Sequence, residues 1–178
     1  MSPAADLRAL IRDIPDFPKP GIVFKDITPL LLDPSAVDAA VMGIADWARP
    51  RDVDLVVAAE ARGFILGAAI ARELATGFVP ARKPGKLPAA VVTSEYILEH
   101  GIDALEMHAD ALAHGARVLI HDDLLATGGT ARALAELVQG LGGIVVGCAF
   151  LVELAFLDGR LRLQGFDVQA LVTYDADG

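Results

Sequence analysis

The feature that most constrains the fold of this chain is the run over residues 118–130. It begins with apolar, largely β-branched side chains at Val118–Ile120, a pattern typical of a buried parallel strand. Small residues follow at 126–129, and from Ala131 to Val138 alanine and leucine recur at helical spacing. A strand, a small-residue turn and a helix in this order predict an α/β fold that binds a ligand at the carboxyl end of the strand.

The turn has the composition of a phosphate-binding loop. Ala126, Gly128 and Gly129 carry little or no side chain, so a phosphate can approach backbone N–H groups at the start of a helix. Thr127 and Thr130 add two hydroxyl donors. No G-x-G-x-x-G opens the helix and no lysine follows the glycines, which excludes the Rossmann and Walker A loops.

Two carboxylates, Asp122 and Asp123, come directly before this loop. Carboxylates can accept hydrogen bonds from ribose hydroxyls, or they can hold a hydrated Mg²⁺ ion together with substrate oxygens. An acidic pair alone would indicate no more than a helix-capping turn. Next to a phosphate loop, it predicts a sugar phosphate as the ligand.

The whole segment D-D-L-L-A-T-G-G-T at 122–130 resembles the phosphoribosyl-pyrophosphate signature of type I phosphoribosyltransferases, in the form found in adenine phosphoribosyltransferases. The resemblance covers residues 14–153 and includes further motifs in the family's order, at 18–29, 60–64, 82–88 and 94–101. It implies transfer of phosphoribosyl from 5-phosphoribosyl 1-pyrophosphate to adenine, which yields AMP and pyrophosphate as a step of purine salvage. It also implies Mg²⁺ as a cofactor and a homodimer.

The resemblance implies a role for each candidate site residue. Glu99 would transfer a proton at the purine, and Asp122 and Asp123 would hold the ribose hydroxyls. The loop that binds the 5′-phosphate would consist of Ala126, Thr127, Gly128, Gly129 and Thr130. Pyrophosphate would be bound by Arg62, Arg82, Lys83 and Lys86. The base would lie against Val23, Phe24, Lys25 and Leu124, and Mg²⁺ would be held mainly by substrate and water.

Three positions bear on base specificity. Enzymes of this fold that use hypoxanthine or guanine generally carry an aspartate where this chain has Ala126, so the group that deprotonates a 6-oxopurine is missing. Lys25 stands where the family usually has arginine, and His100 replaces a tyrosine. Another base, such as xanthine, is therefore one alternative. A non-catalytic sensor of phosphoribosyl pyrophosphate is a second alternative, which Glu99 and the R-K-P-G-K segment argue against.

Composition narrows the possible partners. A formal net charge of −9 argues against non-specific nucleic-acid binding, which needs excess Lys and Arg. Only four lysines are present, and two of them lie with Arg82 inside residues 82–86, where an anion would need them. There is no long uncharged apolar run, and Asp6 interrupts the place of a signal peptide. With Cys148 as the only cysteine, inside an apolar run, we expect a soluble cytoplasmic protein without a membrane partner.

Hydrophobic periodicity and turn residues predict the order of elements. The 178 residues fit one domain: an open parallel sheet with helices on both faces, an N-terminal hood mainly over 1–30, and a mobile β-hairpin at about 82–107. Helices are expected at 4–12, 34–47, 63–75, 131–138 and 158–163, with irregular chain at 13–21. Strands are expected at 55–59, 78–81, 91–98, 102–107, 118–120, 144–152 and 168–173.

Overall fold

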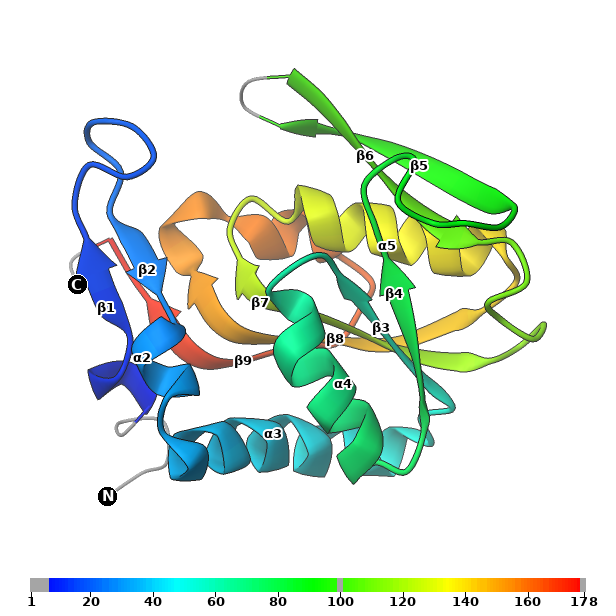
Figure 1. Ribbon diagram of the computed structural model, residues 1–178, viewed down its shortest axis with the longest axis horizontal. Helices are drawn as coiled ribbons and strands as arrows, with labels where there is room; N and C mark the ends of the chain where they lie inside the picture. Colours follow the sequence, from blue (N-terminus) through cyan, green and yellow to red (C-terminus); the bar gives the residue numbers. More distant parts are fainter. Residues whose placement is uncertain (1–6, 99–100, 177–178) are drawn as a thin grey trace.

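The computed structural model describes residues 7–98 and 101–176, and its centre is a parallel sheet of five strands (Figure 1). The strand order is β4-β3-β7-β8-β9, and every neighbouring pair runs parallel. The strands span Gly77–Ala81 (β4), Leu55–Ala59 (β3), Arg117–Leu125 (β7), Ile144–Leu154 (β8) and Val168–Tyr174 (β9). The predicted open α/β sheet is confirmed.

Helices cover both faces of this sheet. Helices α3 (Pro34–Ala48) and α4 (Gly63–Glu73) pack on one face, and α5 (Gly129–Gly140) packs on the other (Figure 1). Because side chains alternate along a strand, Leu119 of β7 enters the core under α3 and α4, whereas Ile120 enters the core under α5. This double coverage explains why the central strands are continuous apolar runs.

Helix α3 begins where the sequence indicated. The Asp33 carboxylate accepts hydrogen bonds from the backbone N–H groups of Ser35 and Ala36, at 2.9 and 3.2 Å, and Pro34 is the first helical residue. The remaining short helices are α2 (Thr28–Leu31) and the 3₁₀ segments η1 (Arg49–Arg51), η2 (Ala155–Leu157) and η3 (Gly159–Leu163). The helix predicted at 158–163 is thus 3₁₀ in type and begins one residue later, after Asp158 in the left-handed region.

The N-terminal segment corrects two expectations. Within its described part, residues 7–9 are helical, but the helix does not continue to Arg12. Strand β1 (Arg12–Ile14) instead pairs antiparallel with β2 (Phe24–Asp26), and Arg12 Nη2 lies 2.6 Å from Asp26 Oδ2. The first residues of the supposedly irregular stretch at 13–21 are therefore a strand. Pairing with a distant segment overrides the local helical preference.

The predicted hairpin is present as β5 (Val91–Leu98) and β6 (Gly101–His108). It forms its own antiparallel sheet and lies over α5, where Ser94 Oγ donates to Glu136 Oε2 at 3.0 Å (Figure 1). Glu99 and His100 lie outside the described residues. None of the helices in 7–98 and 101–176 combines the length and apolar character needed to cross a bilayer.

Candidate active site

The predicted phosphate loop lies at the carboxyl edge of the sheet, between β7 and α5. Strand β7 continues to Leu125, so Asp122, Asp123 and Leu124 are part of the strand, which is longer than the predicted 118–120. Residues 124–131 enclose a small hollow of about 120 Å³. Gly128, the residue before α5, has a φ of +80°, a left-handed conformation that favours glycine. The loop thereby leads directly into the N-terminus of α5, the end of a helix that favours anions.

The carboxylates of Asp122 and Asp123 are crowded together. Asp123 is 4% exposed, and its backbone N–H donates to Asp122 Oδ1 at 2.9 Å. A Cβ atom on Gly63, the first residue of α4, would lie only 2.8 Å from the same oxygen. Burial and the charge of Asp123 raise the pKa of Asp122 well above its ordinary value. Burial also raises the pKa of Asp123, and the nearby Arg62 guanidinium opposes that rise.

Arg62 contacts two other candidate residues, Asp123 and Phe24, which come from separate parts of the chain. Its Nε lies 3.0 Å from Asp123 Oδ2, and its Cζ lies 4.9 Å from the centre of the Phe24 ring. A residue proposed for the base, one for pyrophosphate and one for ribose therefore meet at one edge of the sheet. An arginine placed between an aromatic face and a carboxylate is held in a fixed orientation.

Two cations of the basic segment 82–86 form ion pairs with carboxylates near the same edge of the sheet. Arg82 Nε lies 2.6 Å from Glu60 Oε2, and the Lys83 ammonium pairs with Asp103 on β6. The Arg82 guanidinium also donates to the Lys86 carbonyl oxygen at 3.3 Å. Arg62, Arg82 and Lys83 thus each have a carboxylate partner.

Sequence reasoning missed three residues of this cluster. Glu60 and Asp103 are the partners of Arg82 and Lys83, and Tyr96 on β5 donates to Asp103 Oδ2 at 3.3 Å. Tyr96 also lines a hollow together with Gly129 and Arg132, so the hairpin reaches the start of α5 next to the predicted phosphate loop. Glu60 stands inside the E-A-R-G-F motif, which was an available signal. Tyr96 likewise stands inside the motif at 94–101, whereas Asp103 has no local signal, because the hairpin brings it to the site.

Known proteins of similar sequence and fold show the family to which this chain belongs. A family model described as a phosphoribosyl transferase domain matches residues 31–162. The adenine phosphoribosyltransferase of Solibacter usitatus is 59% identical over 96% of this chain and 98% of its own length. The solved structure of the adenine phosphoribosyltransferase from Thermoanaerobacter pseudethanolicus is 53% identical, with a TM-score of 0.94 over 96% of this chain and 99% of that one. This chain belongs to the adenine phosphoribosyltransferase family.

A further family member with a known structure is the Saccharomyces cerevisiae enzyme, solved with an imino-altritol bisphosphate and adenine. It is 34% identical, with a TM-score of 0.91 over 96% of this chain and 98% of that one. The type I fold expected from the signature is therefore confirmed across bacterial and yeast members.

Lys25 is one point at which this family member departs from the expected arrangement. Its Nζ lies 2.7 Å from Asp13 Oδ1 and 3.9 Å from the centre of the Tyr174 ring. With Val23 it lines a separate cavity of about 540 Å³, while Phe24, the residue between them, turns toward Arg62. The Lys25 side chain is therefore not brought to the cluster of Arg62 and Asp123. Its predicted contact with the base stays a prediction.

A dedicated metal site of protein ligands is absent from the part of the chain that the structure describes. No group of three or more His, Cys, Asp or Glu side chains there could hold an ion. Cys148 is buried, and burial raises the pKa of its thiol to about 12, so it is inert as a nucleophile or ligand at neutral pH.

His121, one residue before the carboxylate pair, should make the stability of the fold sensitive to acid. It is fully buried, its Nδ1 donates to the Ala149 carbonyl oxygen at 2.9 Å, and burial lowers its pKa from 6.5 to about 4. The unfolded chain binds this proton more readily, so stability is present above pH 6.5 and is lost as the pH falls toward 4. The full loss amounts to about 3 kcal/mol of unfolding free energy.

Urea unfolding at pH 7 and pH 4.5 tests this expectation. His121→Asn keeps a donor near the Ala149 carbonyl but does not titrate, so its stability should fall less with acid than that of the unchanged protein. His114→Asn, at an exposed position, serves as the control and should retain the full loss. Equal acid sensitivity of all three proteins would remove His121 as the cause.

Proposed function

We propose that this chain transfers phosphoribosyl from 5-phosphoribosyl 1-pyrophosphate to adenine and releases AMP and pyrophosphate. The observation that carries the proposal is the meeting of Asp123, Arg62 and Phe24 beside the loop at 126–130. A ribose acceptor, a cation and an aromatic face then lie beside a phosphate cradle, in the order that the substrate presents them. The adenine-bound yeast relative, which is 34% identical, supports adenine as the base.

Cleavage of the bond between C1′ and the pyrophosphate oxygen develops positive charge on the ribose and negative charge on the leaving group. The protein must therefore hold base, sugar and pyrophosphate in line. Residues 126–130 would fix the 5′-phosphate through backbone N–H groups and threonine hydroxyls. Asp122 and Asp123 would accept hydrogen bonds from the ribose hydroxyls, and their negative charge favours the cationic centre.

Pyrophosphate would replace the protein's own carboxylates as the partner of the cations at the site. Arg62, Arg82 and Lys83 are each paired with a carboxylate in the structure, so the leaving group would take over cations that are already positioned. In a chain with a net charge of −9, such local placement matters more than the overall field, which repels an anionic substrate. Lys86 would add a further charge from the same loop.

Mg²⁺ is part of this proposal. The oxygen donors of Asp122 and Asp123 at the open edge are of the kind that Mg²⁺ prefers, and one or two carboxylates with substrate oxygens and water complete its shell. When bound, the ion would neutralise charge that develops on the pyrophosphate. Asp122 and Asp123 would hold it through water or ribose hydroxyls.

Adenine would lie against Phe24 and Leu124, with backbone groups near Val23 and Lys25 facing its 6-amino edge. Ala126 offers no carboxylate for a 6-oxopurine. Glu99 would transfer a proton at the purine when the hairpin closes and excludes water. Hood and hairpin would thus close the site from two sides.

The test is nucleotide formation from phosphoribosyl pyrophosphate and Mg²⁺ with adenine, hypoxanthine, guanine, xanthine and orotate in parallel. We expect product with adenine alone. Product with xanthine or another base would keep the scaffold and overturn the argument from Ala126. Binding of phosphoribosyl pyrophosphate without product from any base would identify a sensor instead.

We also propose a homodimer that acts in the cytoplasm in purine salvage. The family resemblance supports the dimer, and the highly charged substrates support a compartment in which nucleotides are made. Light scattering should give about twice the 18.6 kDa of one chain. A single species of 18.6 kDa would refute the dimer.

Replacing either carboxylate should weaken substrate binding. We expect Asp122→Asn and Asp123→Asn each to raise the Kd for phosphoribosyl pyrophosphate about 10-fold or more, because an acceptor for ribose is lost. Isothermal titration of both variants beside Asp110→Asn, an exposed control, measures the effect. An unchanged Kd in both variants would remove the pair from substrate binding.

The Asp122 variant should also gain stability. Because folding raises the pKa of Asp122, the folded protein loses stability as the pH rises above the ordinary carboxyl pKa of 3.8, until the raised pKa is passed. An uncharged asparagine avoids this loss. Asp122→Asn should therefore melt at a higher temperature than the unchanged protein at pH 7.

A further inference from the structure

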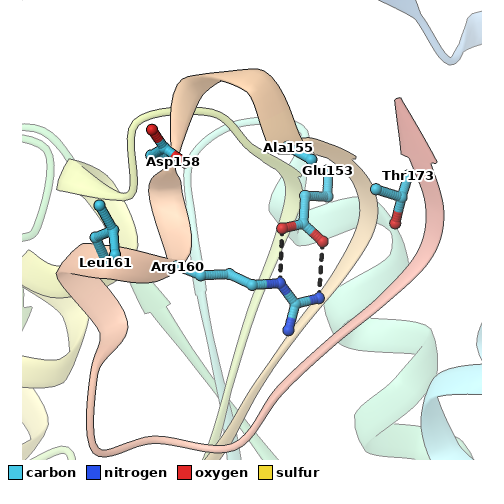
Figure 2. Close-up of a pocket in the computed structure, with 6 residues that line it drawn as sticks. All are labelled: Glu153, Ala155, Asp158, Arg160, Leu161 and Thr173. Carbon is cyan, nitrogen blue, oxygen red and sulfur yellow. Dashed lines mark hydrogen bonds and ion pairs between the residues drawn. The ribbon is translucent and has the colours of Figure 1, made fainter. Parts of the chain in front are cut away.

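Another charged pair, Glu153 and Arg160, lies at the carboxyl edge of the sheet and is outside the residues assigned to substrate. Arg160 donates from Nε and Nη2 to the two oxygens of Glu153, both at 2.7 Å (Figure 2). It also donates from Nη1 to the Val168 carbonyl oxygen at 3.1 Å. The Glu153 side chain is 5% exposed, whereas that of Arg160 is 50% exposed. A buried carboxylate is costly unless it is paired with such planar geometry.

This pair ties a weak segment to the sheet. Glu153 belongs to β8, and Arg160 belongs to η3, a single 3₁₀ segment of five residues. Short 3₁₀ segments have poor internal hydrogen bonds and depend on outside contacts for their position. Leu163, which is 1% exposed, anchors the far end of η3, so Arg160 fixes the end that follows Asp158.

The end that Arg160 fixes is the support of the phosphate loop. A Cβ atom on Gly159 would lie 2.2 Å from the Ala126 carbonyl oxygen, and one on Gly128 would lie 2.4 Å from the Gly159 carbonyl oxygen. The backbones of η3 and the loop are therefore in direct contact on both sides of Gly159. Movement of η3 would remove the surface against which Gly128 holds its left-handed conformation.

We propose that Glu153 and Arg160 are positioning residues for the phosphate loop. Their ion pair holds Gly159 against Ala126 and Gly128, and so keeps the backbone N–H groups of the loop convergent on one phosphate. The inference rests on the proposed function of this loop. It predicts that loss of the ion pair weakens binding of phosphoribosyl pyrophosphate but not of adenine. The contacts of Glu153 and Arg160 are with each other and with Val168, not with Phe24 or the basic segment.

Steady-state kinetics of Arg160→Met and Arg160→Lys test the proposal. In Arg160→Met we expect the KM for phosphoribosyl pyrophosphate to rise about 10-fold or more, since a small misplacement of a positioning group is costly. The KM for adenine and the kcat at saturating substrate should change less than about 3-fold. Arg160→Lys keeps the charge but loses the fork, so its KM should lie between those of Arg160→Met and the unchanged protein.

Two further variants separate positioning from stability. Arg49→Met removes an arginine of similar exposure (46%) from its ion pair with a more exposed carboxylate, between Arg49 Nη2 and Glu73 Oε1 at 2.5 Å, at the far end of α4. It should leave the KM for phosphoribosyl pyrophosphate unchanged. The double variant Glu153→Gln, Arg160→Met removes the buried charge, so it should melt above Arg160→Met and yet keep the raised KM.

The outcomes distinguish this inference from the proposed function. An inactive unchanged protein that also fails to bind phosphoribosyl pyrophosphate would overturn the proposed function. If the unchanged protein is active and Arg160→Met has the same KM for phosphoribosyl pyrophosphate, only the positioning role is overturned. If Arg160→Met does not fold, the same comparison is made with the double variant. Recovery of the normal KM in the double variant would also overturn it, because the defect would then follow stability.

Discussion

Replacing Gly128 by alanine is expected to weaken binding of phosphoribosyl pyrophosphate about 100-fold. Gly128 has a φ of +80°, and an added Cβ atom would lie 2.4 Å from the Gly159 carbonyl oxygen. The left-handed conformation alone costs an alanine about 1–2 kcal/mol, and the close contact forces either the loop or η3 to move. Because the N–H groups of the loop must converge on one phosphate, that movement should abolish most of the affinity.

Titration of the variant with phosphoribosyl pyrophosphate, together with thermal melting, measures both consequences. Gly140→Ala is the matched control, because Gly140 ends α5 and an added Cβ atom there has no neighbour within 4 Å. That control should bind normally and be as stable as the unchanged protein, or up to about 1 kcal/mol more stable. Normal binding by Gly128→Ala would contradict the phosphate role of the loop.

The second large effect is expected at Glu99. Glu99→Gln should lower kcat about 10²-fold to 10⁴-fold, the usual contribution of a general acid or base, and leave the Kd for phosphoribosyl pyrophosphate unchanged. The assignment comes from the family resemblance of residues 94–101, since Glu99 lies outside the described residues. A selective loss of turnover would place it in the chemical step.

Glu95→Gln provides the control for this variant. Glu95 is an exposed carboxylate on β5, four positions before Glu99 in the sequence, so its replacement changes the net charge by the same amount. Stopped-flow or steady-state AMP formation should be normal in Glu95→Gln. Equal turnover in Glu99→Gln and the unchanged protein would exclude Glu99 from the mechanism.

Local pattern was sufficient for most of the fold. The apolar run at 55–59 is β3 with the predicted bounds, and Asp33 caps α3 as its position before Pro34 indicated. The small residues at 126–128 also form the predicted turn between β7 and α5, and their binding of phosphate stays a prediction. These features depend on residues that are close together in the chain.

The errors have the opposite origin. Arg12 belongs to a strand because residues 24–26 pair with it, and a helical pattern cannot report that partner. The motif also did not indicate that the Lys25 side chain contacts Asp13 and Tyr174, while its contact with the base stays a prediction. Tyr96 and Asp103 joined the site only when the hairpin was placed over α5. Each requires knowledge of tertiary contacts.

The pairing of the site's cations also decides where unfavourable electrostatic interactions remain in the fold. Arg62, Arg82 and Lys83 each face a carboxylate, so the positive groups needed for a polyanion do not repel one another before it arrives. The unfavourable interaction is concentrated instead at the half-buried Asp122, where desolvation and the charge of Asp123 raise the pKa. Stability is thus traded for function at one carboxylate, while the cationic half of the site is maintained at little expense to the fold.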